Sequence, residues 1–164
     1  MTGSRQQLFD AFRADHALLG SGIHLLGECV RQEDWEGARS TAAKVSKEAG
    51  PHIAFEEEDF YPALSDIIED SEIDEMYDQH EHGRLLIERI LSLDDDELSK
   101  PAIKDELLAT INDVEGHIAD CGELFGVMGG LDDIDIDNLL EHLQARRLDS
   151  PNWLNRPAKR ETST

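Results

Sequence analysis

The chain of 164 residues carries 37 acidic and 15 basic side chains, which gives a formal net charge of −22. This length suits a single domain with a core of its own. So acidic a chain repels nucleic acid and anionic membranes, and neither is expected as a partner.

The apolar residues predict helices. Along four segments they recur at alternating spacings of four and three, the pattern of helices that pack in a bundle. We therefore predict an all-α fold, an up-down-up-down four-helix bundle over residues 1–130, with helices at about 7–32, 35–69, 72–93 and 101–127. A C-terminal helical extension is expected over 131–149, and a flexible tail over 150–164 on which Trp153 and Leu154 can dock.

The second helix carries the most informative stretch. His52 and Glu56 stand four residues apart and therefore share one side of a helix, among large apolar residues. Burial of both is costly unless a mutual hydrogen bond or a metal ion holds them. The inward face is expected to continue to Asp59 and Ala63, and Pro51 predicts a kink or a short break just before His52.

One histidine lies on the inward face of each predicted helix: His16, His52, His80 and His117. A single one would be read as a core residue, but four in phase converge at one level of a bundle. Four unrelated core histidines are the alternative interpretation. Imidazole with carboxylate suits iron, zinc, manganese or copper, so the five residues with Glu56 predict a metal site. Gly83, one turn after His80, is expected to leave room for a small ligand.

Motifs of other metal and catalytic sites are absent from the sequence. Glu-x-x-His, which ferritin-like carboxylate sites use, does not occur. Neither does the His-Glu-x-x-His of zinc peptidases, a glycine-rich phosphate loop or a Gly-x-Ser-x-Gly elbow.

The chain resembles a hemerythrin-like domain of the HHE cation-binding family over about residues 8–128. The resemblance rests on Asp15-His16, on His52-x-x-x-Glu56-Glu57 running into Phe60-Tyr61-Pro62, on Gln79-His80 and on His117. It implies two non-haem iron ions with an oxo or hydroxo bridge, zinc or manganese being alternatives. It also implies a role in binding O2, in sensing or scavenging NO or peroxide, or in iron homeostasis.

The fourth helix departs from the family's pattern. The second bridging carboxylate belongs four residues after the fourth-helix histidine, or five in the oxygen carriers, where this chain has Cys121 and Gly122. Oxygen carriers also have a histidine one turn after the third-helix one, where this chain has Arg84. Cys121 is either a sixth, thiolate ligand or a small buried residue with a protonated thiol. Asp59 and Asp120 are further candidates.

Three functions and one location follow as expectations. The chain is a binding protein without net chemistry, an iron-dependent enzyme that detoxifies peroxide or NO, or a metal-depleted bundle with a scaffold role. Cys29 and Cys121 form no Cys-x-x-Cys pattern, and no signal peptide or membrane span is evident, so a cytoplasmic protein with reduced thiols is expected. The oligomeric state stays open.

Overall fold

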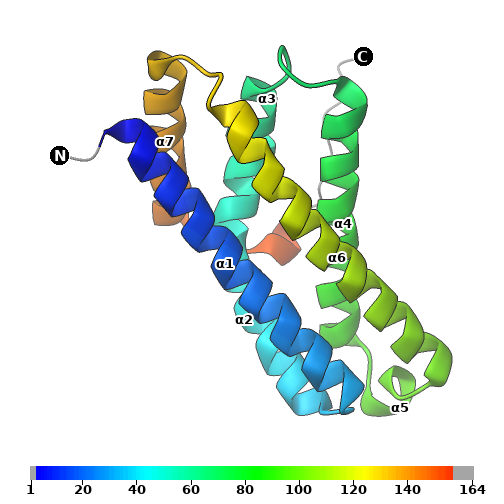
Figure 1. Cartoon of the computed structure of the whole chain (residues 1–164). Helices are drawn as coiled ribbons and strands as arrows, with labels where there is room; N and C mark the ends of the chain where they lie inside the picture. The colour runs from blue at the N-terminus through cyan, green and yellow to red at the C-terminus, as the bar shows by residue number, and fades with distance from the viewer. Residues whose placement is uncertain (1–2, 157–164) are drawn as a thin grey trace.

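Four long helices pack side by side in the computed structural model (Figure 1), which describes residues 3–156 apart from the side chains of 121–123 and 125. They are α1 (Ser4–Arg31), α2 (Trp35–Phe55), α4 (Asp70–Ser92) and α6 (Pro101–Met128). Each contacts the next along the chain, and α6 returns to contact α1. Every regular element of the described residues is a helix, so the all-α prediction is confirmed.

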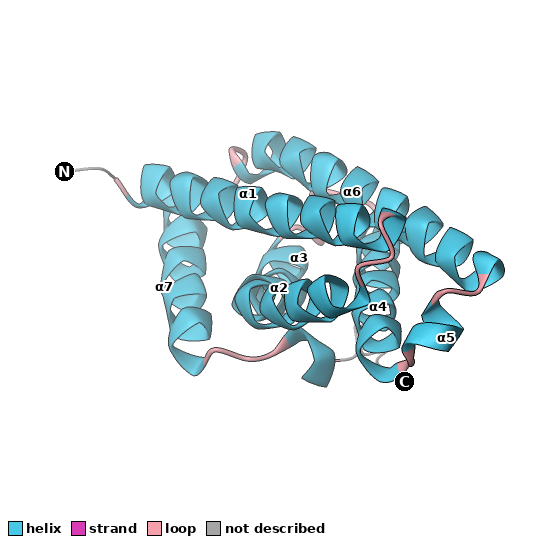
Figure 2. Cartoon of the chain, turned by 90° about the horizontal axis from the view of Figure 1, so that it is seen from below, coloured by secondary structure: helices cyan, strands magenta, loops and turns pink. Residues whose placement is uncertain are grey.

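Shorter helices connect and cover the long ones. The π-helix η1 (Glu56–Phe60) and α3 (Tyr61–Ala63) continue α2, α5 (Asp95–Leu98) precedes α6, and η2 (Trp153–Asn155) is a 3₁₀-helix. α7 (Asp133–Asp149) packs against α1 and α2, beside one end of α1 in Figure 2. The Asp132 side chain caps α7 by accepting a hydrogen bond from the backbone N–H of Asp135. None of the described helices combines the length and apolar character needed to cross a membrane.

α2 continues through Pro51, so the short break that was predicted just before His52 does not occur, and the geometry of the helix changes five residues after the proline. In η1 the backbone N–H of Tyr61 donates to the carbonyl of Glu56, five residues back instead of four. The π turn adds one residue to the helix, so the positions that face the bundle interior shift by one residue along the sequence. Phe60 and Leu64 therefore take the fully buried inward positions that were predicted for Asp59 and Ala63. Asp59 instead faces α7, and Ala63 is only partly buried against the core.

Two apolar clusters fill the bundle, with a polar layer between them. The cluster at the α1–α2 turn contains Ile23, Ala49, Ile87 and Val114. The cluster at the opposite end contains Phe12, Phe55, Tyr77 and Leu124. The four inward histidines lie between these sets along their helices and form the polar layer with Glu56.

Residues 150–156, which we call the C-terminal strap, pack onto α2 and α4. The Trp153 side chain is buried, and the backbone N–H of Leu154 donates to Ser46 Oγ at 3.2 Å, so both docking residues of the predicted tail are held. A Cβ on Gly83 would lie 2.6 Å from Trp153 Cη2, and one on Gly50 would lie 1.8 Å from the Pro151 carbonyl oxygen. The expectation of ligand room at Gly83 is therefore wrong, because the indole of Trp153 fills that space.

Candidate metal centre

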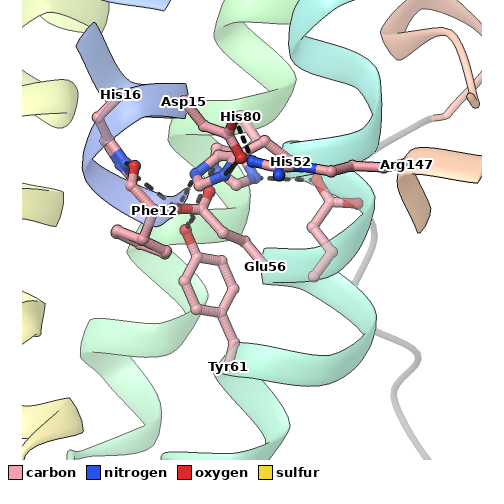
Figure 3. Close-up of polar contacts among 9 residues, drawn as sticks. Phe12, Asp15, His16, His52, Glu56, Tyr61, His80 and Arg147 are labelled. Carbon is pink, nitrogen blue, oxygen red and sulfur yellow. Dashed lines mark hydrogen bonds and ion pairs between the residues drawn. The ribbon is translucent and has the colours of Figure 1, made fainter. Parts of the chain in front are cut away.

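The Glu56 carboxylate lies close to three histidines, His16, His52 and His80, in the middle of the bundle (Figure 3). Its Oε1 lies 2.9 Å from Nε2 of His52 and 3.5 Å from Nε2 of His16. Its Oε2 lies 3.0 Å from Nε2 of His80. The side chains of Glu56, His52 and His80 are buried almost completely. Each carboxylate oxygen therefore serves one side of the polar layer.

The predicted residues form two groups that can hold a metal ion. One consists of His16, His52 and Glu56, and the other of Glu56, His80 and His117, with the ligand atoms of each group within 4.8 Å of one another. Glu56 belongs to both. Two imidazoles and a shared carboxylate per group are donors that suit divalent first-row metals, and a bridging carboxylate suits a pair of them. The residues present fit a two-metal site.

The second ring nitrogen of each of the four candidate ligand histidines lies against an acceptor. Nδ1 of His16 lies 2.9 Å from the carbonyl oxygen of Phe12. Nδ1 of His52 lies 3.2 Å from Asp15 Oδ2, Nδ1 of His80 lies 3.0 Å from Glu57 Oε1, and Nδ1 of His117 bonds Gln79 Oε1. An acceptor at Nδ1 sets the tautomer and turns the lone pair of Nε2 toward the centre. This is how protein histidines are prepared for a metal.

The three side-chain acceptors follow a rule that the sequence alone did not reveal. Asp15, beside His16 on α1, holds the histidine of α2, and Glu57, beside Glu56, holds the histidine of α4. Gln79, beside the α4 histidine, in turn holds the one on α6. All three stand next to a ligand candidate in sequence, which was the available signal, but each acts on the neighbouring helix.

Tyr61 is the second group that sequence reasoning missed. Its hydroxyl donates to Glu56 Oε2 at 3.2 Å and lies 3.2 Å from His80 Nε2. Residues five apart diverge by about 140° on an α-helix but share a side across a π turn. η1 thus brings the hydroxyl into the polar layer. Sequence reasoning, in contrast, counted Tyr61 only among the large apolar residues around His52 and Glu56.

Comparison with known proteins agrees with this geometry. A family model described as hemerythrin HHE cation binding domain matches residues 7–123. The chain belongs to the hemerythrin family. No curated protein and no solved structure matches it. The match spans all five candidate ligands of the two groups and ends before α7, so α7 and the C-terminal strap lie beyond the matched hemerythrin domain.

Charge at the hemerythrin site is strongly coupled. Burial lowers the pKa of His52 and of His80, but nearby carboxylates together outweigh it and raise each pKa to about 9: Glu56 with Asp15 for His52, and Glu56 with Glu57 for His80. Burial raises the pKa of Glu56, and the two rings reverse this and hold that pKa well below its usual range. Burial and the nearby His80 charge lower the pKa of His117 to about 3, and burial also lowers the pKa of His16. A proton and a metal ion compete for each Nε2, so metal binding here releases protons.

Several other candidates belong to neither of the two ligand groups. Arg84 pairs with Glu81 and Glu88 on its own helix. The carboxylate of Asp59 faces α7, where Arg146 Nε lies 3.0 Å away, so Asp59 docks that helix and is not a ligand. Asp120 is exposed and lines an acidic surface groove between α4 and α6. The side chain of Cys121 lies outside the described part of the chain.

Proposed function

We propose that this hemerythrin domain is a non-haem iron protein that holds two iron ions in an up-down-up-down bundle over residues 1–130. It binds, senses or handles O2, NO or peroxide, or takes part in iron homeostasis, in the cytoplasm. His16 and His52 hold one ion, His80 and His117 hold the other, and Glu56 bridges them. The observation that carries the proposal is the shared place of Glu56 in two ligand groups.

The surrounding residues suit a small ligand such as a diatomic molecule or peroxide. Iron in such a site supplies an open coordination position for a diatomic molecule or peroxide. The Phe12 ring lies 4.3 Å from the His16 ring and 4.8 Å from the His52 ring, centroid to centroid. Phe60 packs on Phe12 at 5.2 Å. These rings keep water away, and the Tyr61 hydroxyl offers a hydrogen-bond donor within the layer.

Metal analysis tests the proposal directly. Protein loaded with Fe(II) under anaerobic conditions is expected to contain two iron ions per chain, and its optical spectrum is expected to change on exposure to air, NO or peroxide. Less than one bound transition metal per chain after such loading would contradict it and favour the scaffold role. Two zinc or manganese ions per chain in protein purified from cells would support the two-metal site but show that its metal is not iron.

An enzyme that detoxifies peroxide or NO is the second candidate. Tyr61 favours it, since its hydroxyl oxygen lies 3.2 Å from Glu56 Oε2 and carries an exchangeable proton inside a buried site. A positioned proton donor is what acid–base assistance requires. Repeated turnover of peroxide by the iron-loaded protein would support the enzyme, whereas a single stoichiometric reaction would support the binding protein.

Cys121 is included in the proposal as a sixth ligand, from its place one turn after His117 in the sequence. Replacement of Cys121 by Ser is expected to weaken one of the two metal positions, because a hydroxyl is a poorer ligand than a thiolate. Cys121→Glu is expected to restore a second bridging carboxylate and its iron-pair spectrum. Metal titration with optical spectra measures both. Identical spectra for the two variants and the parent chain would remove Cys121 from the site.

A further inference from the structure

α7 reaches the metal centre through a chain of three polar contacts (Figure 3). Arg147 Nη2 on α7 donates to Asp15 Oδ1 at 2.9 Å. The other oxygen of Asp15, Oδ2, lies 3.2 Å from Nδ1 of His52. The far side of that ring, Nε2, faces Glu56 Oε1 at 2.9 Å. The chain therefore runs from a helix beyond the matched domain to a candidate ligand.

We propose that Arg147 is a positioning residue, which holds Asp15 and through it sets the orientation of the His52 imidazole. The helix that follows the hemerythrin domain thereby tunes metal affinity in the group of His16, His52 and Glu56. The inference rests on the proposed metal role of that group. The other group, with His80 and His117, takes its orienting acceptors from Glu57 and Gln79, and among the described residues no arginine of α7 pairs with either of these.

Both oxygens of Asp15 are engaged, and this is why Arg147 matters. A carboxylate with one partner can still rotate about its side-chain bonds. With one oxygen on His52 and the other on Arg147, the Asp15 carboxylate is fixed at both ends. Outer partners of a metal-binding histidine fix its ring and raise its basicity, so loosening Asp15 loosens the ligand.

The neighbouring arginine provides a matched control. Arg146 pairs with Asp59 at 3.0 Å and with Glu58 at 2.7 Å, and these carboxylates differ from the ones that hold the ligand histidines. Arg146 and Arg147 share a helix, a charge and a partly exposed position. Arg146 docks α7, whereas Arg147 both docks α7 and reaches the site.

Long-range charge acts in the opposite direction. The chain carries a formal charge of −22, and removal of a cation makes it still more attractive to metal ions. Loss of either arginine should therefore strengthen cation binding slightly if charge alone operates. A weaker affinity in Arg147→Ala is a sign of positioning.

The test is zinc binding to the full chain, by competition with a chromophoric chelator. We expect Arg147→Ala to weaken the affinity for one of the two zinc ions on the order of tenfold, which is the low end of the range for losing a residue that orients a metal ligand. Arg147→Lys should recover part of this, and Arg146→Ala should show no weakening. In the metal-free chain, the imidazole ¹⁵N signals of His52 should shift in Arg147→Ala, while those of His80 and His117 should not.

Equal zinc affinities and equal His52 signals in Arg147→Ala and Arg146→Ala would overturn the inference. A parent chain that binds no zinc and no iron would instead overturn the proposed function. In that case the His52 signals of the metal-free chain still decide whether Arg147 positions this ring. The two failures are therefore distinguishable.

Discussion

Replacement of Glu56 by Gln is expected to abolish binding of both metal ions at once. Glu56 is a member of both ligand groups, and its two oxygens face different histidines. Gln keeps the shape but loses the charge that a bridged pair of divalent ions requires. We expect the affinity for each ion to fall by more than about a hundredfold, beyond the range that loss of an orienting partner costs. Metal content per chain after Fe(II) loading measures it.

Glu58→Gln is the matched control for this experiment. Glu58 lies two residues further along η1, but its carboxylate pairs with Arg146 at 2.7 Å. It should keep two ions per chain, with the optical spectrum of the parent protein. Circular dichroism of both metal-free variants checks that the helices are intact. Retention of even one tightly bound ion in Glu56→Gln would contradict a bridging role, since one group would then function without this carboxylate.

The ligand candidates were predictable because helix periodicity is local information. His16, His52, His80 and His117 each fall on an apolar face that can be counted along the sequence. All four lie in the polar layer with Glu56, three of them buried and His16 half-buried. Helix existence and approximate ends followed from the same periodicity. Both inferences need only the residues of one helix at a time.

The supporting residues were not predictable in this way. Tyr61 reaches Glu56 because a π turn adds one residue to the helix, and the spacing of apolar residues does not predict such a turn. Asp15 and Gln79 act on histidines of other helices, so their roles depend on how the helices face one another. Trp153 lies far along the chain from the α4 glycine against which it packs.

Because the C-terminal strap packs beside α4, the effect of Gly83→Ala on the free energy of unfolding should change sign when Trp153 is also replaced by Ala. In the parent chain, Gly83→Ala should destabilise by about 1–3 kcal/mol, the usual cost of overpacking, because the added Cβ would lie 2.6 Å from Trp153 Cη2. Trp153→Ala should cost about 3–5 kcal/mol, as loss of a buried aromatic side chain does. With Trp153→Ala present, Gly83→Ala should stabilise by up to about 1 kcal/mol, because Ala is the better helix former.

The free energy of unfolding of the metal-free chain, from urea denaturation, measures all three variants. Gly116→Ala on α6 is the control, since a Cβ there would meet no heavy atom of the described residues within 4 Å, apart from its chain neighbours and the nearby backbone of its own helix. It should stabilise equally with and without Trp153. The same cost of Gly83→Ala in both backgrounds would mean that the indole does not occupy the space beside α4. The reversal would show that Gly83, one turn from His80, serves the strap, and that a small ligand must reach the site elsewhere.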